Sequence, residues 1–288
     1  DGAALTSYFR RFWDMRDPWV QEYLTKKVIG TLKKYGFGYM KIDYNETIGM
    51  GCDGAESLGE GLRQNMEAAA DFIEKVKREI PGIVLENCSS GGHRLEPGLM
   101  GRMSMASFSD AHECPEIPVI AANLHRLIHP AQSQIWAVIR QEDSIKRIVY
   151  SVANTFLGRM CISGDVTELT EKQWDAIDRG IAFYHKIAPV IKNGISHRFG
   201  PKIKSARHPK GWQGLIRIGK DKVAYAVLHT FGGELPEVIG IPLPEGCPES
   251  MAEVYAEGLC TAENLWIEER MLRWRPKENW EAVAVYLG

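Results

Sequence analysis

The sequence lacks the features that mark several classes of protein. Its 35 basic and 37 acidic residues leave a formal net charge of −2, so there is no cationic excess to attract nucleic acids or anionic membranes. No apolar run approaches the length of a membrane-spanning helix. We therefore expect neither a nucleic-acid partner nor a membrane partner.

Cysteine pairs and metal-binding patterns are also missing. The six cysteines are scattered without a Cys-x-x-Cys pair, at Cys52, Cys88, Cys114, Cys161, Cys247 and Cys260. This spacing favours free thiols and, with no secretory signal at the start of the sequence, predicts a cytoplasmic protein. His, Cys and acidic residues show no metal-ligand spacing, and the glycines of residues 49–54 lack the Lys-Ser/Thr of a phosphate-binding loop. We expect no metal and no cofactor.

What the sequence does contain is a regular alternation of short apolar runs and amphipathic stretches, from Phe12 to about Ile191. The predicted helices cover residues 17–36, 62–80 and 145–156, and a last one opens with a capping box at Thr170 and Gln173. The predicted strands are Tyr39–Asp43, Ile83–Asn87, Ser104–Asp110, Ile135–Val138 and Met160–Ser163.

Repeated strand–helix units of this length predict an α/β fold, with parallel strands and outer helices in a barrel or a doubly wound sheet. After about Gly194 the pattern changes to short strands separated by Gly, Pro and Asn turns. This tail predicts a small antiparallel β domain or sandwich. We predict two domains, residues 1–194 and residues 195–288.

Polar residues recur where the predicted strands end. They are Asp14, Lys41, Asp43, Asn45, Glu86, Asn87, Cys88, Asp110 and Asp165. In a parallel barrel the carboxyl ends of the strands share one edge, and active sites are built there. A single aspartate at such a place is often only a helix cap, but several together favour a site.

Lys41 and Asp43 lie two residues apart in a predicted strand, so they share one face with Tyr39. The cationic Lys41 would favour the ionised, nucleophilic form of Asp43. Two carboxylates that face each other across a pocket suit glycosidic cleavage, in which one attacks the anomeric carbon and the other protonates the leaving oxygen. The alternative is a lysine and an aspartate that only neutralise each other inside the fold, which is costly without further hydrogen bonds.

Five elements between Phe12 and Asn193 together resemble the catalytic barrel of glycoside hydrolase family 36, the retaining α-galactosidases. They are KIDYN, ENCSSGGHR, FSD, PAQSQIW and ISGDVTELTEKQW, in this order along the chain. The segment that begins GWQGLIRIG resembles the C-terminal β domain of the family. The order and spacing of the five elements make chance similarity improbable, although each alone is a weak signal.

The resemblance implies a (β/α)8 barrel and an exo-acting α-galactosidase that works by double displacement. Asp43 would be the nucleophile and Asp110 the general acid/base, with carboxyl groups about 5–5.5 Å apart. The residues that the resemblance implies for substrate binding are Lys41, Asn45, Cys88, Gly91 and Arg94, the last of which would brace the glycine loop or the pocket wall. An oligosaccharide is the implied substrate.

The sequence departs from the family pattern in two ways, which affect the expected sugar specificity and the expected completeness of the barrel. Ser107 and Phe108 stand where many members carry a tryptophan that walls the sugar, so the pocket is expected to be wider or shaped for another pyranoside. The chain also begins at the run into the third barrel strand. We therefore expect strands three to eight here, with the barrel closed by a further N-terminal part or by another chain, for example a second copy in a homo-oligomer. The alternatives are a raffinose- or stachyose-synthase-like transglycosylase, a related α-glycosidase, and a non-catalytic carbohydrate-binding subunit.

Overall fold

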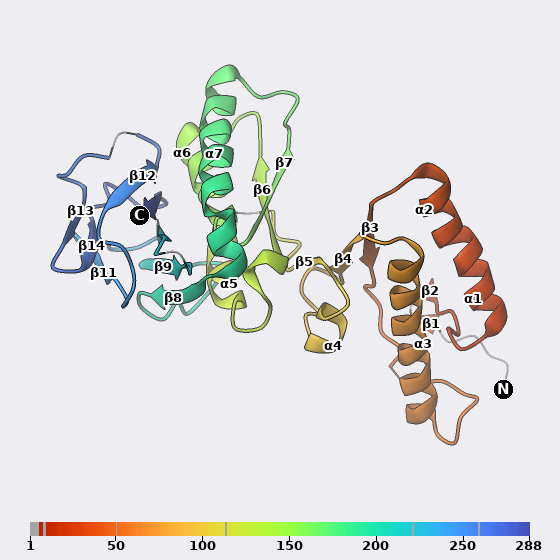
Figure 1. Cartoon of the computed structure of the whole chain (residues 1–288). Helices are drawn as coiled ribbons and strands as arrows, with labels where there is room; N and C mark the ends of the chain where they lie inside the picture. Colours follow the sequence, from red (N-terminus) through yellow and green to blue (C-terminus); the bar gives the residue numbers. More distant parts are fainter. Residues whose placement is uncertain (1–5, 8–9, 50, 113, 221, 259) are drawn as a thin grey trace. The chain divides into compact units, whose positions relative to one another are not determined.

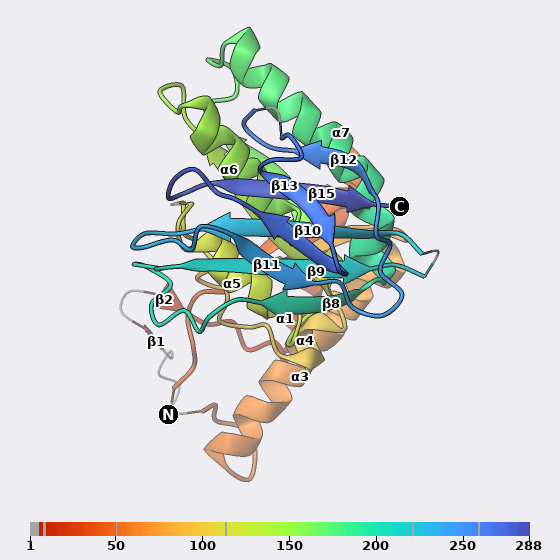
Figure 2. The same cartoon turned by 90° about the vertical axis from the view of Figure 1, so that its left-hand side faces the viewer.

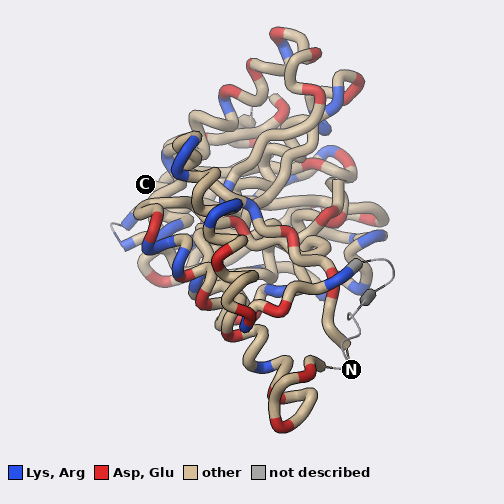
Figure 3. Tube along the Cα trace, turned by 90° about the vertical axis from the view of Figure 1, so that its right-hand side faces the viewer, with Lys and Arg blue, Asp and Glu red and all other residues tan. Residues whose placement is uncertain are grey.

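The chain folds into two compact units, Asp1–Ser107 and Phe108–Gly288 (Figure 1). The structure is a computed structural model, and it describes residues 6–7, 10–49, 51–112, 114–220, 222–258 and 260–288. Basic and acidic residues are interspersed along the trace (Figure 3), in keeping with the small net charge. No helix in these described ranges has the length and apolar character needed to cross a membrane.

The first unit contains three parallel strands and two long helical segments. Strand β3 pairs in parallel with β4, and β4 in parallel with β5. The elements are β1 (Thr6–Ser7), β2 (Arg10–Arg11), α1 (Pro18–Leu24), η1 (Thr25–Ile29), α2 (Gly30–Tyr35), β3 (Tyr39–Asp43), α3 (Leu58–Glu79), β4 (Val84–Cys88), α4 (Pro97–Met100) and β5 (Met105–Ser107).

The first long helical segment begins and ends where the sequence predicts, but it contains a π-helical turn. The Asp17 side chain accepts a hydrogen bond from the Trp19 amide at the start, and Gly36 closes the segment with a φ of 70°. Residues 25–29, between α1 and α2, form the wider π-helix η1. The extra width moves the buried face by one position: α-helical spacing from the buried Val20 would bury Val28, but Ile29 is the buried residue.

Helix α3 lies beside the α1–α2 segment (Figure 1). The Lys75 ammonium donates to the Thr25 hydroxyl at 2.7 Å, and Glu79, one turn further along α3, forms an ion pair with Lys33. Ser57 caps α3 by accepting a hydrogen bond from the Glu60 amide. These two helical segments precede β3 and β4, as expected for strand–helix units.

The second unit combines a parallel strand pair, three helices and two antiparallel sheets. Strands β6 and β7 are parallel, and the predicted capping box of Thr170 and Gln173 opens α7. The elements are α5 (Ile117–Leu124), η2 (Pro130–Gln132), β6 (Ser133–Ile139), α6 (Ile145–Thr155), β7 (Arg159–Gly164), α7 (Glu171–Asn193), β8 (Ile195–Phe199), β9 (Trp212–Ile218), β10 (Ala224–Thr230), β11 (Ile239–Pro242), β12 (Met251–Tyr255), β13 (Leu265–Glu268), β14 (Met271–Trp274) and β15 (Ala282–Leu287).

The C-terminal strands form a five-stranded sheet in the order β12-β15-β10-β9-β8 and a three-stranded sheet in the order β11-β14-β13 (Figure 2). A single apolar core joins the two sheets and includes Ile216, Leu228, Ile241, Leu272 and Val285. Helices α6 and α7 pack against each other and against the five-stranded sheet. That sheet therefore has a helical layer on one face and the smaller sheet on the other (Figure 2).

Arg217 and Tyr225 tie the five-stranded sheet to the end of α6. The guanidinium of the fully buried Arg217 donates to the Leu157 carbonyl at 3.1 Å and to the Ser196 hydroxyl at 2.8 Å. It also donates to the Tyr225 hydroxyl, which itself donates to the Phe156 carbonyl at 2.6 Å. Burial raises the pKa of Tyr225 to about 12, although the adjacent guanidinium opposes the effect, so the hydroxyl keeps its proton.

The structure confirms an α/β fold with parallel strands. The predicted strand Ser104–Asp110 is too long, because only Met105–Ser107 is extended and the chain leaves the strand at Phe108. The domain boundary predicted after residue 194 falls inside the second unit, between α7 and β8, and stays a prediction. No disulfide joins any two of the six cysteines, all of which lie in the described ranges, in keeping with their spacing.

Candidate active site

Strand β3 presents Tyr39, Lys41 and Asp43 on one face. All three are exposed, whereas Met40 and Ile42 on the other face are half-buried. In the parallel register, Lys41 lies opposite Glu86 of β4 and Asp43 lies opposite Cys88. Residues two apart on a strand point the same way, so these polar side chains share one surface of the sheet.

Glu86 is the centre of the polar contacts on this surface. Its carboxylate is 1% exposed, and its Oε1 lies 3.4 Å from the Lys41 Nζ. The hydroxyls of Tyr39 on β3 and Ser107 on β5 donate to the two oxygens of the same carboxylate. Two side chains of β3 and one of β5 therefore contact a buried anion on β4. The sequence predicts that Lys41 acts on Asp43; the structure adds an ion pair between Lys41 and Glu86 that the sequence does not predict, and the effect on Asp43 stays a prediction.

Lys41 keeps its charge in this setting. Burial on its own would lower the pKa of its ammonium, but the negative charge and hydrogen bond of Glu86, with smaller effects of Cys88 and Asp43, raise that pKa above the ordinary value. Lys41 is 34% exposed at the side chain, so its ammonium contacts a buried partner and is still open to solvent.

Cys88 ends β4 and is buried beside Asp43. Burial raises the pKa of its thiol, while a backbone hydrogen bond from Gly91 and the charge of Lys41 oppose that effect and Asp43 adds to it. The thiol is therefore protonated near neutral pH and is a poor nucleophile. It can serve as a weak hydrogen-bonding and packing group next to the exposed carboxylate of Asp43.

The glycine loop after β4 has an unusual backbone that Asn45 holds in place. Ser90 and Gly91 both adopt left-handed conformations, with φ of 45° and 78°. Such a conformation is costly for a serine. The Asn45 Oδ1 accepts a hydrogen bond from the Ser90 amide at 2.7 Å, which fixes the turn against the segment that follows β3. No partner of the Asn45 Nδ2 falls within the described residues, so this amide is available as a donor.

Arg94 clamps the same loop to the segment after β3. Its Nε donates to the Tyr44 carbonyl and to the Ser89 hydroxyl, each at 3.1 Å, and its Nη2 donates to the Glu46 carbonyl at 2.8 Å. The guanidinium also stacks over the Tyr44 ring. These contacts make Arg94 a brace of the site, and its role in substrate binding stays a prediction.

Asp110, the predicted acid/base, belongs to the second unit. It is exposed and follows the buried Phe108 in a segment without regular structure. The pairing of Asp110 with Asp43 therefore stays a prediction. Two residues further on, the His112 ring meets the Trp136 ring edge-on, with centroids 5.7 Å apart.

The carboxyl ends of β6 and β7 carry a second ion pair. Arg140 Nη1 lies 3.2 Å from Asp165 Oδ1, and the Asp165 amide donates to the Ile139 carbonyl. Asp165 is one of the strand-end residues singled out by the sequence, whereas Arg140 is not. The pair joins the two loops that leave these strands.

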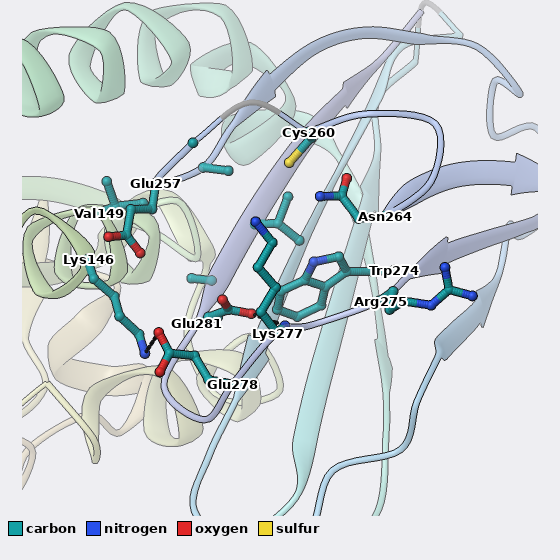
Figure 4. Close-up of a pocket in the computed structure, with 14 residues that line it drawn as sticks. Lys146, Val149, Glu257, Cys260, Asn264, Trp274, Arg275, Lys277, Glu278 and Glu281 are labelled. Atoms are coloured by element: carbon teal, nitrogen blue, oxygen red, sulfur yellow. Dashed lines mark hydrogen bonds and ion pairs between the residues drawn. The ribbon is translucent and has the colours of Figure 1, made fainter.

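Two open cavities lie elsewhere in the second unit, and none of the predicted site residues lines either of them. The cavity in Figure 4 has a volume of about 360 Å³, and the Lys146–Glu278 ion pair of 2.8 Å stands at its edge. Its lining includes Glu257, Asn264, Trp274, Lys277 and Glu281. Within the described ranges, no group of three or more His, Cys, Asp or Glu side chains could hold a metal ion.

Comparison with known proteins shows which family the chain belongs to. The family model described as Melibiase matches residues 5–194, about two thirds of the chain. The chain belongs to the melibiase family. All the residues on the β3, β4 and β5 surface, the glycine loop and Asp110 lie inside the matched segment.

Melibiase relatives are similar over most of this chain at low identity. A probable α-galactosidase C of Aspergillus terreus is 23% identical over 76% of the chain and 28% of its own length. The α-galactosidase AgaA of Geobacillus stearothermophilus is 23% identical over 62% of the chain and 25% of its own length. The chain thus spans about a quarter of the length of these curated relatives.

Solved structures of melibiase relatives share the fold. The galactosidase domain of the α-galactosidase–sucrose kinase AgaSK superposes on 99% of this chain with a TM-score of 0.77 at 16% identity, and the match covers 39% of that domain's chain. AgaA superposes with a TM-score of 0.75 at 18% identity, covering 99% of this chain and 41% of its own. At these identities the superpositions establish the fold alone.

Sequence reasoning missed the structural roles of Glu86, Tyr39 and Ser107. Glu86 was noted only as a polar strand-end residue, although a carboxylate inside the apolar run IVLEN was itself a signal of a buried, paired acid. Its partners were not predictable, because they come from two other strands and depend on the sheet register. Ser107 was singled out for the tryptophan it replaces, and the structure instead shows its hydroxyl bound to Glu86.

Proposed function

We propose that this chain carries the catalytic machinery of a retaining, exo-acting α-galactosidase that removes terminal α-D-galactosyl residues from oligosaccharides. The observation that carries the proposal is the shared surface of Lys41, Asp43 and Cys88 on two parallel strands, in a chain of the melibiase family. An exposed carboxylate next to a charged ammonium suits attack on an anomeric carbon, because the cation favours the ionised form.

In this mechanism Asp43 is the nucleophile and Asp110 the general acid/base. An Asp43 oxygen forms a bond to the anomeric carbon while the glycosidic C–O bond breaks, and the Asp110 carboxyl gives its proton to the leaving oxygen. The Asp110 carboxylate then takes a proton from water, whose oxygen attacks the same carbon and releases Asp43. Two inversions retain the α configuration. The two carboxyl groups are expected about 5–5.5 Å apart.

The neighbouring groups supply sugar recognition. Lys41 and Asn45 offer an ammonium and an amide donor to the hydroxyls, and Cys88 and Gly91 form the adjoining wall, with Arg94 holding the glycine loop. The choice of sugar and substrate draws on relatives: structures of AgaA contain stachyose, raffinose or 1-deoxygalactonojirimycin. The surface around Asp43 is proposed to accept the same class of ligand.

We further propose that the parallel strands of both units belong to one (β/α)8 barrel and that residues 195–288, which follow in the chain, form a β-sandwich domain. The parallel pairings β3-β4, β4-β5 and β6-β7 and the fold shared with α-galactosidases support the barrel. The two antiparallel sheets around one core support the sandwich. The remaining strands would come from a further part of the polypeptide or from a partner chain.

The test is an aryl-glycoside panel on the full-length protein that contains this chain. We expect turnover of aryl α-galactosides, release of α-galactose as the first product by NMR, and loss of turnover in Asp43→Asn with the fold intact. A first product of β configuration would refute the retaining mechanism. Sugar transfer that dominates over hydrolysis with an acceptor present would identify a transglycosylase, and binding without turnover in the wild type would identify a carbohydrate-binding subunit.

A further inference from the structure

Burying the ionised carboxylate of Glu86 costs hydration free energy, which contacts with its surroundings must offset. An ionised carboxyl group taken out of water loses several kcal/mol of hydration, and only good partners compensate for the loss. Glu86 has such partners: the ammonium of Lys41 at 3.4 Å and the hydroxyls of Tyr39 and Ser107. At 1% exposure it is closed to solvent, so it is not itself placed to attack or protonate a sugar.

The partners of Glu86 also fix its orientation. Tyr39 donates to Oε2, while Ser107 and Lys41 approach Oε1. These donors come from the two strands that flank β4, so the carboxylate cannot rotate without breaking a contact on one side. An anion held this way gives Lys41 one preferred position on the surface that Asp43 shares.

We propose that Glu86 is a positioning residue, which keeps the Lys41 ammonium charged and fixed beside Asp43. In that position Lys41 can donate to a sugar hydroxyl and favour the ionised form of the nucleophile. The proposal rests on the proposed glycosidase function for its effect on turnover, but its effect on Lys41 is independent of that function. Without Glu86 the pKa of Lys41 would be lower, because burial of the ammonium opposes protonation and Glu86 is the main group that counteracts this effect. Cys88 and Asp43 are the other titratable groups that act on Lys41.

The first measurement is the titration of Lys41 in the wild type and in Glu86→Gln, followed by NMR of ¹³C-labelled lysine side chains, with Lys41→Arg used to assign the signal. Glutamine keeps the shape and the hydrogen-bonding oxygen but removes the charge. We expect a downward shift of the Lys41 midpoint. The matched control is Glu79→Gln, which removes the partner of the exposed Lys33 on the surface of the same unit and should leave Lys41 unchanged.

The second measurement is turnover of an aryl α-galactoside by the same variants. We expect a loss in kcat of roughly 10²-fold in Glu86→Gln, since misplacement of a catalytic group by about 1 Å has an effect of that size, and no loss in Glu79→Gln. Tyr39→Phe removes one donor to Glu86 and keeps the ring. It should lower kcat by a smaller factor, and it provides the test if Glu86→Gln does not fold.

The two measurements separate the possible failures. An unchanged Lys41 midpoint in a folded Glu86→Gln variant overturns the inference whatever the activity. If only Tyr39→Phe folds, an unchanged kcat in that variant overturns the positioning role. A shifted midpoint with unchanged kcat overturns the positioning role while leaving the electrostatic link. A wild-type protein without turnover refutes the proposed function alone, because the titration of Lys41 still reports on its dependence on Glu86.

Discussion

The guanidinium carbon of Arg94 lies 4.2 Å from the centre of the Tyr44 ring, so the end of the glycine loop is stacked on the residue that follows β3. With the hydrogen bonds to the Tyr44 and Glu46 carbonyls, one side chain joins the two loops that border the proposed nucleophile. Arginine suits this task because its planar group stacks and donates in several directions at once.

Replacing Arg94 with lysine should therefore loosen both loops while keeping the charge. An ammonium cannot stack in the same way or reach three acceptors, so we expect faster amide exchange in residues 44–49 and 89–94. Hydrogen–deuterium exchange with mass spectrometry measures this directly. Arg63→Lys, on the exposed face of α3, is the matched control. Equal exchange in the wild type and Arg94→Lys would show that the clamp does not order the loops.

Asp43→Ala should reveal the nucleophile by chemical rescue. Removing the carboxylate is expected to lower kcat on an aryl α-galactoside by roughly 10³-fold or more. Azide can occupy the vacated space and attack the anomeric carbon from the side opposite the leaving group. The product should then be β-galactosyl azide, identified by NMR, with partial recovery of rate. Asp71→Ala, on the exposed side of α3, should keep full activity. Rescue that yields the α-azide, or no azide product at all, would contradict the assignment.

His229 should make the second unit sensitive to acid. It is fully buried on β10 without a hydrogen-bond partner for either ring nitrogen within the described residues, and burial lowers its pKa from 6.5 to about 3. Because the unfolded chain binds a proton below pH 6.5 and the folded chain does not until about pH 3, this histidine lowers the free energy of unfolding as the pH falls through that window. The effect can reach several kcal/mol at its lower end.

Urea unfolding at pH 7 and pH 5 tests this contribution. We expect His229→Phe to lose less stability between the two pH values than the wild type does, since phenylalanine takes up no proton in either state. His208→Ala, at an exposed position, should follow the wild type. An equal loss of unfolding free energy in His229→Phe and the wild type would mean that other groups cause the loss of stability at acid pH.

Arg217→Lys should destabilise the second unit although it keeps the charge. Lysine cannot reach the Leu157 carbonyl and the hydroxyls of Ser196 and Tyr225 together, so at least one buried polar group loses its partner. We expect a loss of about 2 kcal/mol in the free energy of unfolding, and about 1 kcal/mol for Tyr225→Phe. Denaturant titration measures both. An unchanged free energy of unfolding in Arg217→Lys would show that the contacts of Arg217 are not needed to hold the five-stranded sheet and α6 together.

The elements with strong local signals were predictable from the sequence, and those held by distant partners were not. The strand Tyr39–Asp43 and the capping box of α7 were predicted at the correct residues, because alternation and capping chemistry act over a few positions. Strands β8, β11, β13 and β14 were missed, since each has only four or five residues and is defined by its pairing with neighbouring strands.

The same distinction applies to the candidate site. Lys41 and Asp43 stood out because they are close in sequence and share a face. The ion pair with Glu86 spans 45 positions of the chain and depends on the parallel register of β3 and β4, which no local pattern specifies. The clamp by Arg94 was partly expected from its place in the glycine loop, but its carbonyl acceptors are backbone groups that a sequence does not mark.

The wide turn η1 has a consequence for how the first unit tolerates insertions and deletions. A five-residue π turn holds one residue more than an α-helical path between the buried Val20 and Leu32 would need. Shortening residues 25–29 by one position would return the segment to a regular α-helix. The shorter chain would then reach Gly36 at nearly the same angle about the helix axis, whereas an α-helix of the present length would reach it rotated by about 100°. The π turn therefore sets the phase at which the helix delivers the strand that carries Lys41 and Asp43.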